Sequence, residues 1–332
     1  MGRVEEGRDS ALTGQSTDSG AAQQPGKGWW AALSGLADSE KWSGFAFISP
    51  WFIGFFIFTA GPMVASLALS FTQYDILRPA EYVGLDNYRQ LIEDPRLRLS
   101  LLNSFFYAAL HVPLATIVAL GLAQLLAGVG GKIANFFRTA FYVPSVTPAV
   151  AVGTLWLWIL NPQIGLLNRG LRFMGLPGPG WTTDPTWIKP GIVLMSLWSL
   201  GGTVIIYYAA LKNVPRTLYE AARIDGASAW QQFRYITVPM ISGAIFFTLI
   251  VNTIGSLQMF TEVYTMYFGQ MQSGTAGSAA LFYVIYLFRQ AFEFLHMGYA
   301  SAMAWLLFVI ILILTAIQLR LGNRWVYYEG GR

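Results

Sequence analysis

Long runs of apolar residues, separated by shorter polar segments, dominate this sequence. Six of the runs are long enough for a helix to cross roughly 30 Å of hydrocarbon. The pattern therefore predicts an all-α, polytopic membrane protein with six transmembrane helices. Their predicted bounds are residues 45–71, 101–127, 139–160, 191–211, 240–262 and 298–319.

Residues 263–288 also lack charges, but their middle is rich in Gly, Gln, Ser and Thr, which suit lipid poorly. With six spans, both chain ends, the loop holding Lys132 and Arg138, and residues 212–239 share one side. Lys and Arg are favoured on the cytoplasmic side, so we expect both termini in the cytoplasm, although four arginines crowd the opposite loop. Residues 281–294 are then predicted to be a re-entrant or interfacial segment.

Residues 212–239 form the longest charged segment among the apolar runs. Pro215 suits the first turn of a helix, and the Asp-Gly pair at 225–226 predicts where that helix ends. Ser228 and Gln231 then have the spacing of a capping box, which predicts a second short helix to about residue 236. We expect two short helices joined by a tight bend.

A string of residues within this segment matches a known motif: Glu220, Ala221, Ala222, Asp225, Gly226, Ala227, Phe233, Ile236 and Pro239. It resembles the EAA loop of ABC-importer permease subunits, in particular those of the carbohydrate-uptake (maltose or glycerol-3-phosphate) type; Val238 stands where that family usually has Leu. The resemblance implies the type I importer permease fold. It also implies that Glu220 to Ala222, Asp225 to Ala227 and Phe233 couple to a separate ATPase subunit through a cytoplasmic coupling helix-turn-helix.

Other parts of the chain are similar to the same family. Residues 82–88 look like its first external loop, 138–168 like its third span and external turn, and 298–302 like the start of its last span. The Gly-Gly-Pro that usually follows the fifth span is absent, and residues 269–274 occupy that place. The shape of this outer loop is therefore left open.

Composition agrees with a membrane protein. The chain of 332 residues is 55% hydrophobic and 11% charged, whereas soluble domains carry about 25% charged residues. The absence of cysteine excludes disulfides, and a net charge of +4 spread over loops does not suggest nucleic-acid binding. His111 and His296 are interpreted as polar contacts within apolar surroundings. Residues 1–41 are predicted to be a disordered cytoplasmic tail, and 42–329 the permease domain.

The sequence encodes no energy source for transport. Residues 128–133 resemble a phosphate-binding loop only loosely, because the first Gly and the Ser or Thr after Lys132 are missing. We see no catalytic constellation and no metal site, so the chain is not expected to be an enzyme. ATP and Mg²⁺ are expected to be bound by a partner subunit.

Polar and aromatic residues within the spans predict the substrate path, because such groups are costly when they face lipid. Asn252, Ser256 and Met259 lie on one helix face at i, i+4 and i+7, with Glu262 a turn further. The fourth span offers Trp198, Thr203 and Tyr207, and the second offers Asn103 and Tyr107. Small polar residues also hold membrane helices together, so a purely structural role is the alternative for each.

These observations lead to a permease subunit of an ATP-driven, binding-protein-dependent sugar importer in a bacterial inner membrane. The implied partners are a second homologous permease, two ATP-binding cassette subunits and an extracytoplasmic solute-binding protein. One alternative keeps this machinery but carries glycerol phosphate, a polyamine or another solute. An ion-coupled secondary transporter would show inverted repeats and intramembrane ionisable residues, which are not evident. A membrane enzyme is the third alternative.

Overall fold

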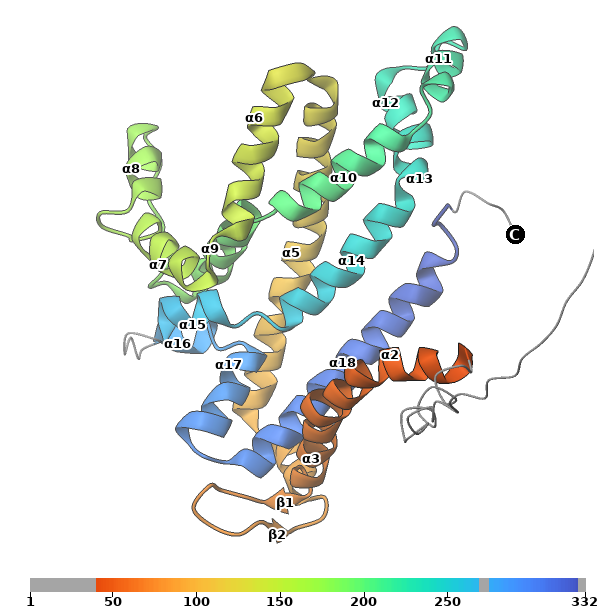
Figure 1. The fold of residues 1–332 in the computed structure, drawn as a ribbon. Coiled ribbons are helices and arrows are strands. Elements are labelled where there is room, and N and C mark those ends of the chain that lie inside the picture. Colours follow the sequence, from red (N-terminus) through yellow and green to blue (C-terminus); the bar gives the residue numbers. More distant parts are fainter. Residues whose placement is uncertain (1–39, 269–274, 328–332) are drawn as a thin grey trace, which may run out of the picture. The chain divides into compact units, whose positions relative to one another are not determined.

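The computed structural model describes residues 40–268 and 275–327 (Figure 1). Within these ranges the chain is mostly helical, as predicted. A short antiparallel hairpin pairs β1 (Thr72–Gln73) with β2 (Glu81–Tyr82). The predicted disordered tail falls almost entirely on residues 1–39, which lie outside the described residues, and the predicted boundary at residue 42 stays a prediction.

Helical elements follow one another with few intervening residues. In chain order the α-helices are α2 (Glu40–Phe55), α3 (Gly61–Leu69), α4 (Asp86–Glu93), α5 (Pro95–Gly128), α6 (Gly131–Tyr142), α7 (Ala149–Ile159), α8 (Leu166–Phe173), α9 (Pro185–Trp198), α10 (Gly201–Asn213), α11 (Arg216–Ile224), α12 (Ala229–Gln232), α13 (Val238–Met240), α14 (Ser242–Leu257), α15 (Thr261–Tyr267), α16 (Thr275–Ala279), α17 (Tyr283–Phe288) and α18 (Met297–Gly322). The π-helical turns are η1 (Phe56–Ala60), η3 (Phe233–Thr237) and η4 (Arg289–Glu293), and η2 (Val143–Val146) is a 3-10 turn.

Four helical stretches of the described chain are long and apolar enough to cross a membrane by themselves: Gly44–Leu69, Pro95–Gly128, Ser242–Tyr267 and Met297–Gly322. Two helix pairs pass the same test together. Gly131–Val146 and Ala149–Ile159 meet at 100°, and Pro185–Trp198 and Gly201–Asn213 meet at 51°. The described residues therefore hold four to six candidate spans, and six is the number if each bent pair counts as one. The predicted third span is not one straight helix, because Pro144 and Pro148 lie at the bend.

The chain divides into two compact units, residues 1–63 and 64–332. The described part of the first unit is helical, and large apolar side chains cover its surface. Phe47 and Phe58 are 87% and 79% exposed, and Trp51 stacks on Phe55 at 5.5 Å. Apolar side chains around the whole circumference suit a helix surrounded by lipid.

In the second unit α5 is the central helix, and it packs against α9, α10, α14 and α17. It begins at Pro95, where Asp94 caps the first turn. Ala115, Ala119 and Ala123 are fully buried at four-residue spacing. Small side chains in this pattern let neighbouring helices approach closely, which is how membrane helices gain packing energy.

Two glycines fix close approaches elsewhere in this unit. A Cβ on Gly201 would overlap the carbonyl oxygen of Phe141, where α10 meets the end of α6. A Cβ on Gly298 would overlap the carbonyl oxygen of Thr72, where α18 meets β1. Both glycines allow backbone contacts that no other residue permits.

Residues 281–291 lie largely within the protein core, whereas Phe292 and Phe294 are 61% and 41% exposed. Phe282, Tyr283 and Ile285 are fully buried, and α17 packs against α5 and α18. The first part of this segment is therefore buried against α5 and α18 and its end is exposed, so its assignment as a re-entrant or interfacial segment stays a prediction.

The turn between α5 and α6 lies at the same end of this unit as α11 and α12, and the β1–β2 hairpin lies at the other end (Figure 1). We call these the α11 end and the hairpin end.

Candidate functional site

A cavity of about 290 Å³ lies inside the helix bundle. Its walls come from α5, α7, α9, α10 and α14, together with the chain between α14 and α15. The break between α14 and α15 helps to form it: Phe260 has φ −140° and ψ −68°, so the helix stops after Leu257 and restarts at Thr261. Interrupted membrane helices are a common way to build a binding site near the bilayer centre.

Aromatic and hydroxyl groups form one wall of this cavity. The Tyr107 hydroxyl lies 2.7 Å from Ser196 Oγ, and Ser196 donates to the carbonyl of Ile192. His111 stacks on the Tyr107 ring at 5.1 Å, and its Nδ1 lies 3.0 Å from Ser256 Oγ. This wall is therefore held in place by hydrogen bonds between α5, α9 and α14.

The residues predicted on one face of the fifth span also contribute to the cavity. Asn252, Ser256 and Met259 all line the cavity, as do Thr203 and Glu262. The side-chain nitrogen of Asn252 is buried and has no hydrogen-bond partner among the described residues. A buried donor without a partner costs free energy, and a ligand oxygen in the cavity would restore the missing bond.

Glu262 reaches this wall because α15 packs tightly on α7. A Cβ on Gly153 of α7 would lie 2.8 Å from the carbonyl oxygen of Glu262. Glycine at position 153 therefore allows α15 to lie close to α7. The sequence locates Glu262 a turn beyond Met259, but the close approach of α15 to α7 has no local signal in it.

Three other polar or aromatic residues named from the sequence lie outside the cavity lining. Trp198 packs edge-on against Trp156 at 6.2 Å. Tyr207 is fully buried, and its hydroxyl is hydrogen-bonded to Thr248. Asn103 donates to the carbonyls of Ser278 and Leu281 at 3.0 Å each, and so joins α5 to the chain around α16 and α17.

His111, Ser196 and Glu262 line the cavity but were not assigned to the substrate path. His111 was interpreted as a polar contact, and its bond to Ser256 is such a contact. Ser196 gave no signal in the sequence, because serine is common inside membrane helices. Within the described residues, no three His, Cys, Asp or Glu gather as metal ligands would.

The second candidate site is residues 212–239, which we call the coupling segment. Helix α11 ends as the sequence predicts: Gly226 has φ +77°, and the N–H groups of Gly226 and Ala227 donate to Arg223 and Ala222. This Schellman motif closes the helix. Helix α12 begins with the predicted capping box between Ser228 and Gln231, which is confirmed.

The second helix does not stop near residue 236. It continues through the π-helical turn η3 into α13, which contains Pro239. Proline has no N–H to donate, and the wider π-turn absorbs the missing bond. The coupling segment is thus continuous with the helical path into α14.

Much of the coupling segment is exposed. Ile224 is 87% exposed and Trp230 is 67% exposed. Of the residues predicted to couple, Ala222, Ala227 and Phe233 are partly buried, while the other four are exposed: Glu220, Ala221, Asp225 and Gly226. The Tyr219 hydroxyl lies 2.9 Å from Thr237 Oγ1 and joins the two helices.

At the hairpin end, Asp94 gathers four hydrogen bonds. Tyr286 and Tyr299 donate to Oδ2 at 2.6 and 2.8 Å, and the backbone N–H groups of Arg96 and Leu97 donate to Oδ1. Burial opposes ionisation of Asp94, but these hydrogen bonds outweigh it and lower the pKa of the carboxyl. Burial, with the bond to Asp94, raises the pKa of Tyr286 to about 12. A carboxylate therefore fastens α5 to α17 and α18.

Comparison with known proteins decides the family. Residues 111–327 match the family described as "Binding-protein-dependent transport system inner membrane component". The chain belongs to this family. The matched residues include the coupling segment and most of the cavity, and the resemblance of the sequence to this family is confirmed.

Individual permeases are similar over most of their length. A probable ABC transporter permease protein of Bacillus subtilis (strain 168), YesP, is 39% identical over 87% of this chain and 93% of its own. The lactose transport system permease protein LacF of Rhizobium radiobacter is 32% identical over 83% and 92%. The arabinooligosaccharides transport system permease protein AraP of B. subtilis is 30% identical over 88% and 93%.

Solved structures show the same fold. A chain in the crystal structure of a bacterial ABC transporter involved in the import of the acidic polysaccharide alginate has a TM-score of 0.74, at 24% identity over 89% of this chain and 98% of its own. A second structure of a bacterial alginate transporter, in complex with a periplasmic protein bound to an alginate pentasaccharide, has the same score over 97% of the matching chain. This permease is thus a multi-pass membrane component of a transport system.

Proposed function

We propose that this permease imports a carbohydrate, as one of two permease subunits that form the translocation path. The observation that carries the proposal is the cavity around Asn252, which lies inside the bundle and offers hydroxyl, amide and aromatic groups. Sugars present hydroxyls and apolar ring faces, and these groups suit them. The names of the lactose and arabinooligosaccharide permeases support the same class of cargo.

The charges in the cavity bear on the alternative cargoes. Glu262 lines the cavity, and neither Lys nor Arg is among the lining residues. Recognition of a phosphate group depends on cationic side chains or clustered N–H donors, so this lining argues against glycerol phosphate. A polyamine would leave the many hydroxyls and the amide of the cavity without an evident role.

The coupling segment is proposed to dock on an ATPase subunit that binds ATP and Mg²⁺. Ile224 and Trp230 provide exposed apolar surface at the α11 end, and small residues at Ala221 and Gly226 allow close approach of another backbone. We place this end, and both termini, in the cytoplasm, and count six spans. Two ATPase subunits, a second permease and an external solute-binding protein complete the proposed assembly.

Uptake by the reconstituted importer tests this proposal. The complete complex in liposomes, with ATP inside and solute-binding protein outside, is offered radiolabelled lactose, arabinooligosaccharides, glycerol 3-phosphate and spermidine. We expect uptake of a saccharide. ATP-dependent uptake of only glycerol 3-phosphate or spermidine would contradict the proposed cargo.

Variants of α14 test the cavity. Asn252→Leu removes the unpaired amide and is expected to lower saccharide uptake roughly 5- to 150-fold, since a lost hydrogen bond to a buried group is worth on the order of 1–3 kcal/mol. Phe247→Leu is the matched control, because Phe247 lies on the same helix and is 56% exposed. Equal uptake by both variants would show that the cavity is not part of the substrate path.

A further inference from the structure

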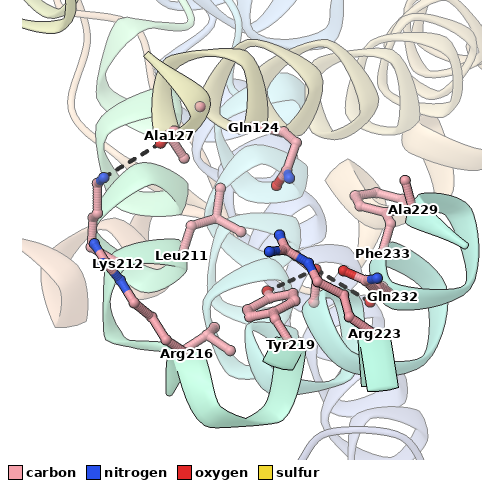
Figure 2. Close-up of a pocket in the computed structure, with 13 residues that line it drawn as sticks. Gln124, Ala127, Leu211, Lys212, Arg216, Tyr219, Arg223, Ala229, Gln232 and Phe233 are labelled. Atoms are coloured by element: carbon pink, nitrogen blue, oxygen red, sulfur yellow. Dashed lines mark hydrogen bonds between the residues drawn. The ribbon is translucent and has the colours of Figure 1, made fainter. Parts of the chain in front are cut away.

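A second cavity, of about 420 Å³, lies between the coupling segment and the ends of α5 and α10 (Figure 2). Gln124 and Gly128 line it from α5, and Lys212 lines it from α10. Helices α11 and α12 and the turn η3 close the other side. Sites for small molecules have volumes of roughly 300–1,000 Å³, so this cavity is large enough for one.

The charges around this cavity have one sign. Lys212, Arg216 and Arg223 line it, and no Asp or Glu is among its thirteen lining residues. The carboxylates of the coupling segment, Glu220 and Asp225, are exposed and lie outside the lining. Like charges gathered around one space repel each other, so an anion in that space stabilises all three.

None of the three cations forms an ion pair with a carboxylate of the described residues. The ion pairs among residues 40–268 and 275–327 are Arg78–Asp75, Arg89–Asp86 and Arg289–Glu293. Lys212 Nζ donates to the carbonyl of Ala127 at 3.4 Å, which holds its ammonium group beside the end of α5. The positive charge of the cavity is therefore available to a ligand.

Neutral donors complete the lining. Figure 2 shows Arg223 extending between Tyr219 and Gln232, and Gln124 pointing into the same space from α5. Arginine presents several N–H groups in a planar fork that matches phosphate oxygens, and side-chain amides add further donors. A phosphate monoester carries about −1.5 to −2 charges at pH 7 and three acceptor oxygens, so it can pair with these three cations of α10 and α11 better than a single carboxylate can.

We propose that this cavity binds a phosphate-bearing anion. The two sources of that chemistry are a soluble phosphorylated metabolite and the headgroup of an anionic phospholipid. A bound phosphate would join the coupling segment, through Arg216 and Arg223, to α5 and α10, and so would favour the arrangement of these helices that the ligand fits best. Binding depends on this chain's own residues and not on its cargo, so the outcome is independent of the proposed sugar import.

Calorimetry on the full-length chain in a neutral detergent tests the binding. One arm titrates glucose 6-phosphate, with glucose as the uncharged control. The other arm titrates dihexanoyl phosphatidylglycerol, with dihexanoyl phosphatidylcholine as the control. Binding of glucose 6-phosphate assigns a soluble ligand, and binding of phosphatidylglycerol alone assigns a headgroup. Binding of neither probe to the wild-type chain overturns the proposal.

Variants locate the bound probe. The double variant Arg216→Gln with Arg223→Gln is expected to weaken binding of the active probe at least tenfold. Arg234→Gln makes the same change at an exposed position of the coupling segment outside the lining, and should stay within twofold. If the double variant does not fold, as judged by tryptophan fluorescence, Gln124→Leu replaces it, with an expected threefold loss. An equal loss in Arg234→Gln, or no loss in the lining variants, places the probe elsewhere and overturns the proposal.

Discussion

The two ends of the second unit are held together by different means. At the hairpin end, Asp94 accepts four hydrogen bonds, Asn87 donates to the carbonyls of Ser70 and Thr72, and Tyr283 donates to Met303. At the α11 end, the coupling segment is mostly exposed, and the hydrogen bonds on its own helices are largely local. The hairpin end, which we call the frame, is therefore cross-linked between elements that are distant in the sequence, whereas the coupling segment has few hydrogen bonds to the rest of the unit.

The largest expected difference comes from two glycines. Gly298→Ala should prevent folding or cost more than about 3 kcal/mol, because the new Cβ would overlap the Thr72 carbonyl and the surrounding frame cannot yield. Gly226→Ala at the α11 end meets no atom within 4 Å and carries only the cost of its φ of +77°, about 1 kcal/mol. Tryptophan-fluorescence melting of the purified variants measures both. Similar melting temperatures of the two variants would show that both ends tolerate an added Cβ equally well.

The next effect concerns Asp94. Asp94→Ala leaves two tyrosine hydroxyls and two backbone N–H groups unpaired, so we expect a loss of about 3 kcal/mol in the free energy of unfolding. Asp86→Ala is the control: its ion pair with Arg89 joins two exposed side chains and should be worth less than about 1 kcal/mol. Chemical unfolding in mixed micelles compares the two. A small loss for Asp94→Ala would mean that the frame does not depend on this carboxylate.

A functional test asks whether the bend at Gly226 in the coupling segment docks on a partner subunit. Gly226→Arg should leave membrane insertion and basal ATP hydrolysis of the complex intact, and lower uptake at least tenfold, because a large side chain at this bend blocks close approach of a partner. Gly175→Arg is the matched control, since Gly175 has φ +75° with nothing near its Cβ, and lies outside the coupling segment. Uptake at the normal rate in Gly226→Arg would contradict the proposal that the bend docks on a partner subunit.

A smaller effect is expected within the coupling segment. Tyr219→Phe removes the bond to Thr237 and should cost about 1 kcal/mol or less. Backbone amides of residues 216–237 should exchange with solvent several-fold faster, while those of α5 are unchanged. Tyr235→Phe, at a position that is 70% exposed, serves as the control and should leave exchange as it is. Unchanged exchange in Tyr219→Phe would show that the two helices are held by packing alone.

The smallest effect is a dependence on pH. The pKa of Asp94 is lowered from its ordinary value of 3.8, so its stabilisation is complete above that value and is lost as the pH falls through the lowered pKa. The melting temperature of the wild type should therefore fall more steeply below about pH 4 than that of Asp94→Asn. Melting temperatures that fall equally steeply with pH in the two proteins would contradict the lowered pKa of Asp94.

Local signals in the sequence were enough for the coupling segment. The bend at Gly226 and the capping box at Ser228 depend on residues a few positions apart, so both can be predicted without knowledge of the rest of the fold. The same holds for the membrane class, since apolar length reports the solvent around a helix. Asn252 and Ser256 line one cavity because they lie one turn apart on α14 and helical periodicity is local, whereas Met259 lines it from the break after Leu257.

Contacts between distant residues were decided by the tertiary structure. The third apolar run bends by 100°, and Pro144 alone does not set such an angle. Tyr207 and Trp198 share the character of cavity residues, yet packing turns them toward other partners. Glu262 lines one cavity because Gly153 lets α15 lie close to α7, and Lys212 and Arg223 line another because α10 and α11 both lie beside the end of α5. A sequence records which groups are present, and long-range packing decides which of them share a space.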